Sequence, residues 1–265
     1  MELKDTTIIV PIFNRQKYIN NVIEYYKGFN LLFVDSSNTP FDYPEEVNFI
    51  ECSGMLLYEA LNKALKQIDT KYVCWNNDDD IATKDFLVKG EEFLLNNPDY
   101  SNVLGQQIKV HKDLSPTHDQ YGKKEYNVWK KGTLISDKTI DRIHYMNNYF
   151  HTPVHGIMLK ECLLDSTLIP LNDDTFYPIK YFDRIVGIVQ ACYGNKKVLP
   201  MISCLRRENS RMINSKNYPE QLKKYVRQNN LVNHFKEDKN YFIDYLLSKE
   251  LSLEEIRSIN FNNKL

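Results

Sequence analysis

The stretch that decides the fold is Tyr72-Val73-Cys74-Trp75-Asn76-Asn77-Asp78-Asp79-Asp80. Its first four residues are apolar or aromatic, which predicts a buried strand, and the strand ends directly in two amides and three carboxylates. Carboxylates side by side at a strand end repel one another unless they are solvated or bind a cation. The stretch therefore predicts a sheet strand with a ligand-binding turn at its carboxyl end. A solvated turn that caps the next helix is the alternative.

Working outward from this strand, apolar runs of strand length alternate with segments of helical periodicity. The other expected strands are Thr6 to Val10, Leu31 to Val34, Val47 to Glu51, Val154 to Leu159 and Val198 to Leu205. The expected helices are Gln16 to Lys27, Leu56 to Ile68, Lys84 to Asn96 and Ile179 to Tyr193. This alternation predicts an α/β fold with a Rossmann-like, mainly parallel twisted sheet flanked by helices. The polar clusters Asn14-Arg15, Asp35-Ser36 and Asn77 to Asp80 then share one rim of the sheet.

The chain is expected to divide into residues 1–105, residues 106–212 and a helical C-terminal extension over residues 213–265. Residues 107–150 show no clear period and are expected to cover the substrate. The helical extension has apolar stripes suited to packing on the core, to a homodimer or to a membrane face.

Composition restricts the function classes. The 265 residues are 42% hydrophobic and 26% charged, which suits one sizeable core. The formal net charge of −1 gives no field for binding nucleic acid. The five cysteines are odd in number and mostly lie in apolar runs, as reduced core thiols do. With neither a signal-like start nor a segment of about 20 apolar residues, we expect a cytoplasmic protein whose membrane contact is at most peripheral.

The polar clusters occur in a recognisable order along the chain: Ile8-Ile9-Val10-Pro11 with Phe13-Asn14-Arg15, then Phe33-Val34-Asp35-Ser36-Ser37, then Asn62, then Val73 to Asp80. This ordered set resembles the donor half of the GT-A fold glycosyltransferases, in particular the large inverting family 2. The resemblance covers about the first hundred residues well and the rest loosely. It implies a nucleotide-sugar donor site.

The resemblance also implies roles for individual residues. Those that would bind the donor are Pro11, Phe13, Asn14, Arg15, Asp35, Ser36, Asn62, Asn77 and Asp78. Among them, Asp35 would accept hydrogen bonds from the base or the ribose. Asp79 would be the ligand of Mn²⁺ or Mg²⁺, because hard cations of this kind prefer oxygen ligands. Asn77 stands where the family's first acidic residue is expected, and Leu61 where a basic residue is common, which weakens the expected hold on the metal.

On the acceptor side, Tyr181-Phe182-Asp183-Arg184 resembles the family motif that carries the catalytic base, so Asp183 would take the proton of the acceptor hydroxyl. An ion pair on a helix surface is the alternative for this aspartate. Asp173 and Asp174 are competing carboxylates. Arg207, with Arg206 and Asn209, falls where a basic residue near the diphosphate is expected, because guanidinium groups suit phosphate. The six histidines lack the spacing of a zinc site and are expected to be structural or to line the acceptor.

The leading hypothesis is an inverting transfer of a hexose-type sugar from a nucleoside diphosphate, most favourably UDP, to a hydroxyl of a bacterial surface glycan of capsule or lipopolysaccharide type. The acceptor would be a free or lipid-linked glycan. A nucleotidyltransferase is a weaker hypothesis, because its glycine-rich loop after the first strand is replaced by Phe13-Asn14-Arg15. A non-catalytic module that binds a nucleotide or glycan is the third, supported by Asn77 and Leu61.

Overall fold

The computed structural model describes residues 3–39, 41–110, 133–148, 155–169, 178–207 and 244–259. The strands are β1 Thr6–Ile12, β2 Leu31–Asp35, β3 Asn48–Glu51, β4 Tyr72–Trp75, β5 Ile81–Ala82, β6 Tyr100–Val110, β7 Ile157–Leu159 and β8 Asn195–Arg207. The helices are the 3₁₀ turn η1 Gln16–Tyr18, then α1 Ile19–Tyr25, α2 Leu57–Leu65, α3 Lys84–Asn96, α6 Thr139–Asn148, α7 Lys160–Leu168, α8 Pro178–Tyr193 and α11 Leu253–Ser258.

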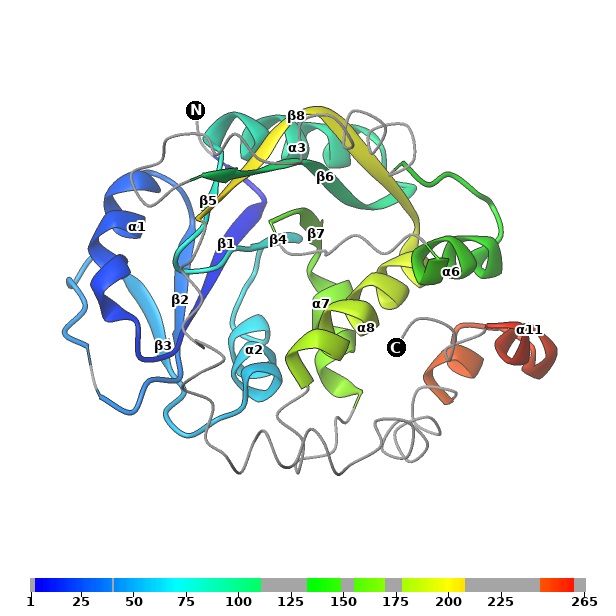
Figure 1. Cartoon of the computed structure of the whole chain (residues 1–265), viewed down its shortest axis with the longest axis horizontal. Helices are drawn as coiled ribbons and strands as arrows, with labels where there is room; N and C mark the ends of the chain where they lie inside the picture. Colours follow the sequence, from blue (N-terminus) through cyan, green and yellow to red (C-terminus); the bar gives the residue numbers. More distant parts are fainter. Residues whose placement is uncertain are drawn as a thin grey trace.

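The described strands form one sheet in the order β3-β2-β1-β4-β7-β6-β8-β5, with helices on both faces (Figure 1). The pairings among β3, β2, β1 and β4 are all parallel, as the alternation of strands and helices predicts. Beyond β4 the sheet becomes mixed, because β7 runs antiparallel to both β4 and β6, and β5 runs antiparallel to β8. The α/β class is confirmed. The sheet is mixed beyond β4, where β6 and β8 pair in parallel and the pairings of β7 and β5 are antiparallel.

Alternate residues of each central strand face two separate cores. In β1, Ile8 and Val10 pack with α1 and α3 on one face, whereas Ile9 packs with α2, α7 and α8 on the other. All three side chains are fully buried. Since burying one such side chain contributes about 1.5–3 kcal/mol, the two faces together hold the carboxyl ends of the strands in fixed positions.

The structure differs from the sequence-based expectation where no period is visible. β6 extends into residues 107–150, the segment predicted to be irregular, and α6 lies inside this segment. α7 was not predicted either. In β6 the usual apolar alternation is replaced by buried polar residues with partners. Ser101 donates to the Gln190 carbonyl at 2.8 Å, and Asn102 donates to the Ile157 carbonyl at 3.2 Å. These bonds pair the Ser101 hydroxyl and the Asn102 amide nitrogen inside the sheet, so this strand contains buried polar residues in place of an apolar pattern.

Residues 244–259 contact the helices of the second half of the fold. The Asp165 carboxylate of α7 accepts hydrogen bonds from the Tyr193 hydroxyl at 2.6 Å and from Lys249 Nζ at 3.2 Å. The Ser258 hydroxyl lies 3.0 Å from His144 Nε2 of α6. The rest of the predicted C-terminal extension lies outside the described residues. Within the described part of the chain, every helix is too short or too polar to cross a bilayer.

Candidate functional site

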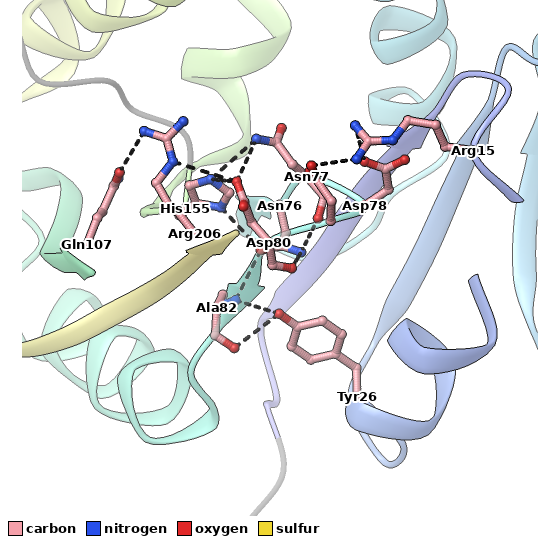
Figure 2. Close-up of polar contacts among 11 residues, drawn as sticks. Arg15, Tyr26, Asn76, Asn77, Asp78, Asp80, Ala82, Gln107, His155 and Arg206 are labelled. Atoms are coloured by element: carbon pink, nitrogen blue, oxygen red, sulfur yellow. Dashed lines mark hydrogen bonds and ion pairs between the residues drawn. The ribbon is translucent and has the colours of Figure 1, made fainter. Parts of the chain in front are cut away.

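The acidic turn between β4 and β5 is built around the buried side chain of Asn76 (Figure 2). The Asn76 amide donates to the carbonyls of Asn77 at 2.7 Å and Asp80 at 3.2 Å, and its Oδ1 accepts the Ala82 N–H at 3.1 Å. The Tyr26 hydroxyl, just beyond α1, accepts a second bond from the Ala82 N–H at 2.7 Å and donates to the Ala82 carbonyl at 3.0 Å. The backbone of the turn is thus fixed from inside, and its carboxylates are presented in a defined arrangement.

Arg15 reaches two of these carboxylates from the loop after β1. Its Nη1 lies 3.1 Å from Asp78 Oδ1, and its Nη2 lies 2.5 Å from Asp79 Oδ2. The side chains of Asp78 and Asp79 are only 6% and 7% exposed, so the pairing takes place largely away from water. Burial raises the pKa of the Asp78 carboxyl to about 7; Arg15 opposes the rise, and the neighbouring Asp79 adds to it. Asp78 Oδ2 is buried without a hydrogen-bond partner.

Asp80 has different partners. Its Oδ2 accepts from His155 Nε2 and from Asn77 Nδ2, both at 3.1 Å, and Arg206 Nε lies 3.7 Å away. Burial alone would raise the pKa of Asp80, but the hydrogen bonds and charges of these partners, His155 first, lower it below its ordinary value. Asp80 is therefore a buried carboxylate whose charge is stabilised by these three partners.

His155 is clamped between the two ends of the acidic turn. Its side chain is 1% exposed, and its Nδ1 lies 3.2 Å from Asn76 Oδ1, which already acts as an acceptor for Ala82. Nδ1 therefore faces an amide oxygen, and Nε2 faces the Asp80 carboxylate at 3.1 Å and the Asn77 amide nitrogen at 3.4 Å. The backbone of His155 has φ 68°, and its N–H donates to the Trp75 carbonyl at 2.8 Å. This left-handed residue joins the start of β7 to the end of β4.

Two groups of side chains carry atoms that could bind a metal ion. Ligand atoms of Asp80, His155 and Cys204 lie within 4.8 Å of one another, and all three residues are buried. However, Asp80 Oδ2 already faces three nitrogen donors, so this group is satisfied internally. Asp78 and Asp79 offer hard carboxylate oxygens, one of them buried and unpartnered, and these fit Mg²⁺ or Mn²⁺.

The loops after β1 and β2 form the neighbouring part of the rim. Asn14, at φ 54°, donates its N–H to Ser37 Oγ at 2.8 Å and accepts the Asn38 N–H on its Oδ1 at 3.1 Å. The buried Asp35 accepts the Ser37 N–H at 2.9 Å on one oxygen and the Tyr43 hydroxyl at 2.9 Å on the other. These contacts hold the Asp35 carboxylate at the end of β2, next to the loop that carries Arg15.

The remaining predicted donor residues differ in their surroundings. Pro11 lies in β1 opposite Val34, Ser36 is buried with its N–H on the Ile12 carbonyl, and the Phe13 side chain is 51% exposed. Asn62 donates to Thr167 Oγ1 at 2.8 Å, which ties α2 to α7. This hydrogen bond contributes to helix packing, and the role of Asn62 in donor binding stays a prediction.

On the acceptor side, Asp183 lies half-buried in the first turns of α8. The preceding Phe182 packs on Trp75, with ring centroids 5.6 Å apart, so the start of α8 meets the end of β4 just before the acidic turn. Arg207 is the last residue of β8, and its side chain lies outside the described residues, as do Asp173, Asp174 and Asn209. Arg206 is the basic side chain of this strand that reaches the acidic turn.

Two residues of the site were missed by sequence reasoning. His155 was expected to be structural or to line the acceptor, yet its ring bonds directly to the acidic turn. Its only sequence signal is the strand that follows it, because the contact depends on β7 pairing with β4. Tyr43 lies in a loop without a period, and its hydroxyl reaches Asp35 while its ring stacks on Phe49 at 4.4 Å.

Comparison with known proteins places these features in context. Residues 7–161, more than half of the chain, match the family described as "Glycosyl transferase family 2". The structure of S. aureus TarS 1–349 in complex with UDP-GlcNAc is 17% identical in sequence to this chain and superposes with a TM-score of 0.55. The match covers 84% of this chain and 65% of the TarS chain. The mannosyltransferase PcManGT from Pyrobaculum calidifontis, in complex with GDP-Man and Mn²⁺, has 15% identity and a TM-score of 0.52, over 96% and 73%.

At these identities the similarity shows a shared fold. In a further TarS 1–349 structure, this chain spans 60% of the matched chain, at 18% identity and a TM-score of 0.52. No curated protein sequence matches the chain significantly.

Proposed function

Because the chain belongs to glycosyl transferase family 2, we propose that it transfers a sugar from a nucleoside diphosphate, UDP in the first instance, to a hydroxyl of a bacterial surface glycan. The observation that carries this proposal is the set of Arg15, Asp78 and Asp79 at the end of β4, beside Asp35 at the end of β2. Ligands of parallel sheets bind at such carboxyl ends. The UDP-GlcNAc bound to TarS and the GDP-Man and Mn²⁺ bound to PcManGT are consistent with it.

On the donor side, residues 1–105 would bind the nucleotide. Asp35 would accept hydrogen bonds from the base or the ribose, since its carboxylate is held in position by Ser37 and Tyr43. Asp78 and Asp79 would hold a divalent cation, Mn²⁺ or Mg²⁺. When bound, such a cation supplies positive charge where negative charge develops on the leaving diphosphate. Arg15 and Arg206 are the basic side chains at the same turn, and their guanidinium groups suit phosphate oxygens.

On the acceptor side, residues 106–212 would bind the glycan. Asp183 would remove the proton of the attacking hydroxyl. Because this hydroxyl would attack from the face opposite the leaving diphosphate, the configuration at the anomeric carbon would be inverted. The contact of Phe182 with Trp75 supports this role, because it brings the start of α8 to the donor rim. The acceptor would be free or lipid-linked, on the cytoplasmic face of the membrane. Residues 213–265 would form a C-terminal extension that stabilises this half or mediates a dimer.

A non-catalytic nucleotide-binding or glycan-binding module is the second candidate. The observation that favours it is Asn77, whose amide donates to Asp80 at the position where a carboxylate is expected in the family. A cation bound at this site would therefore have one negatively charged ligand fewer than a cation bound in the family. Such a module would still bind a nucleoside diphosphate but would leave a nucleotide sugar intact.

Calorimetric titration of UDP, GDP, CDP and dTDP, with and without Mn²⁺, tests the donor site. We expect one nucleotide to bind in a Mn²⁺-dependent way to the native chain and not to Asp79→Ala. Asp85→Ala, a change of an aspartate in the first turn of α3, is the matched control and should bind as the native chain does. If none of the four nucleotides binds, with or without Mn²⁺, the proposed function is wrong.

A further inference from the structure

The guanidinium of Arg15 lies between the same two carboxylates that fit the divalent cation. Its two terminal nitrogens lie 3.1 Å from Asp78 Oδ1 and 2.5 Å from Asp79 Oδ2, so one side chain bridges both. The Arg15 side chain is 15% exposed, and its guanidinium carbon lies 5.1 Å from the centre of the Tyr18 ring. A cation that bridges Asp78 and Asp79 would need the space that this guanidinium fills.

The charge balance of the turn makes this position significant. Asp80 is matched by His155, with Asn77 and Arg206 also pointing at its Oδ2, so it makes little demand on Arg15. Asp78 and Asp79 then share one positive charge between two nearly buried carboxylates. One of their oxygens, Asp78 Oδ2, is left buried without a hydrogen-bond partner. Arg15 brings one positive charge to this pair of carboxylates, whereas a divalent cation would bring two.

We propose that Arg15 acts as an internal substitute for the divalent cation: it occupies the Asp78–Asp79 site before the donor binds, and metal entry displaces it toward the diphosphate. This inference rests on the proposed function, because it assumes that the turn binds a metal together with a nucleoside diphosphate. Displacement would need only side-chain rotation, since Asn14 and Gln16, and not the Arg15 side chain, hold this loop to the loop after β2. The guanidinium keeps a charged partner in both states, because the diphosphate replaces the two carboxylates.

The proposal makes metal binding and the Arg15 ion pair mutually exclusive. Linkage then requires that removing the guanidinium tightens metal binding in the absence of nucleotide. The affinity of Arg15→Gln for Mn²⁺ should rise by roughly 5- to 150-fold, the usual range for coupled sites. The affinity of the same variant for the nucleoside diphosphate, at saturating Mn²⁺, should fall, because the guanidinium no longer contacts the phosphates.

The experiment is a titration of the full chain with Mn²⁺ alone, followed by the electron paramagnetic resonance signal of free Mn²⁺. Arg206→Gln is the matched control, since it removes a guanidinium from the same turn but one that faces Asp80. We expect tighter Mn²⁺ binding in Arg15→Gln and a much smaller change in Arg206→Gln. Arg15→Lys, which keeps the charge but cannot bridge both carboxylates with a planar fork, should give an intermediate affinity.

A second readout uses the native chain and does not depend on a variant folding. Modification of Arg15 by phenylglyoxal, located by mass spectrometry, should become faster when Mn²⁺ is added. Unchanged Mn²⁺ affinity in Arg15→Gln, an equal gain in Arg206→Gln, or Mn²⁺-independent labelling of Arg15 would each overturn the inference. The proposed function fails by a different result, namely that the native chain binds no nucleoside diphosphate with Mn²⁺ present.

Discussion

Replacing His155 by glutamine tests the contact between His155 and Asp80 that supports the acidic turn. The change removes a charge-assisted hydrogen bond to Asp80 and a hydrogen bond to Asn76, at 3.1 and 3.2 Å. A bond to a charged group contributes about 1.5–3 kcal/mol and a neutral one about 1 kcal/mol, and the glutamine amide can restore one of them as a neutral bond. Because both partners are nearly fully buried, water cannot replace the lost donor. We therefore expect the free energy of unfolding to fall by about 1.5–3 kcal/mol.

The assay is urea denaturation at pH 7, followed by tryptophan fluorescence and by far-UV circular dichroism. His144→Gln is the matched control, because it changes a histidine whose recorded partner is the exposed Ser258, and its effect should stay within about 0.5 kcal/mol. A loss of less than about 0.5 kcal/mol in His155→Gln would refute the reasoning. It would mean that the Asp80–His155 contact contributes nothing beyond what solvent provides.

Three further predictions concern other parts of the fold. Burial lowers the pKa of Lys196 to about 7, so between this pH and about 10.5 the unfolded chain binds a proton that the folded chain does not. The free energy of unfolding in urea should therefore rise from about pH 7 to about pH 10 in the native chain and in Lys197→Met, but not in Lys196→Met. Equal pH slopes in all three proteins would contradict this. Gly156→Ala should lower the free energy of unfolding by about 1–3 kcal/mol in thermal denaturation, because the added Cβ would lie 2.8 Å from the Val103 carbonyl oxygen, and unchanged stability would count against this contact. Asp183→Asn should lower kcat by about 10²- to 10⁴-fold without changing calorimetric nucleotide affinity, whereas lost nucleotide binding would assign Asp183 to the donor side.

The first half of the fold could be predicted because its signals are local. The apolar runs that become β1, β2 and β4 are buried on both faces, and the 3.6-residue period of α2 matches its buried face of Ala60, Leu61, Ala64 and Leu65. Polar residues at the strand ends then had to share a rim, because parallel strands place their carboxyl ends on one edge. Arg15, Asp78 and Asp79 do contact one another there.

The second half could be predicted only in part. The expected strands Val154 to Leu159 and Val198 to Leu205 and the expected helix Ile179 to Tyr193 correspond to β7, β8 and α8. The elements that were not predicted depend on long-range contacts. β6 is stabilised by hydrogen bonds of buried polar side chains, which gives it no alternating pattern. His155 reaches Asn76 across 79 positions of the sequence, through an antiparallel pairing that alternating strands and helices do not imply. Tyr43 is recognisable only from its contact with Asp35. The site therefore includes partners that only the folded chain identifies.

The most direct test of the account is the release of free nucleoside diphosphate from nucleotide sugars incubated with the full chain and Mn²⁺. UDP-, GDP-, CDP- and dTDP-sugars would be compared by anion-exchange chromatography, using the native chain and Asp79→Ala. We expect that the native chain cleaves one donor, that cleavage needs the metal, and that Asp79→Ala loses this activity. Mn²⁺-dependent binding of a donor that is never cleaved, even with glycan acceptors added, would contradict the transferase and leave a nucleotide-binding module in its place.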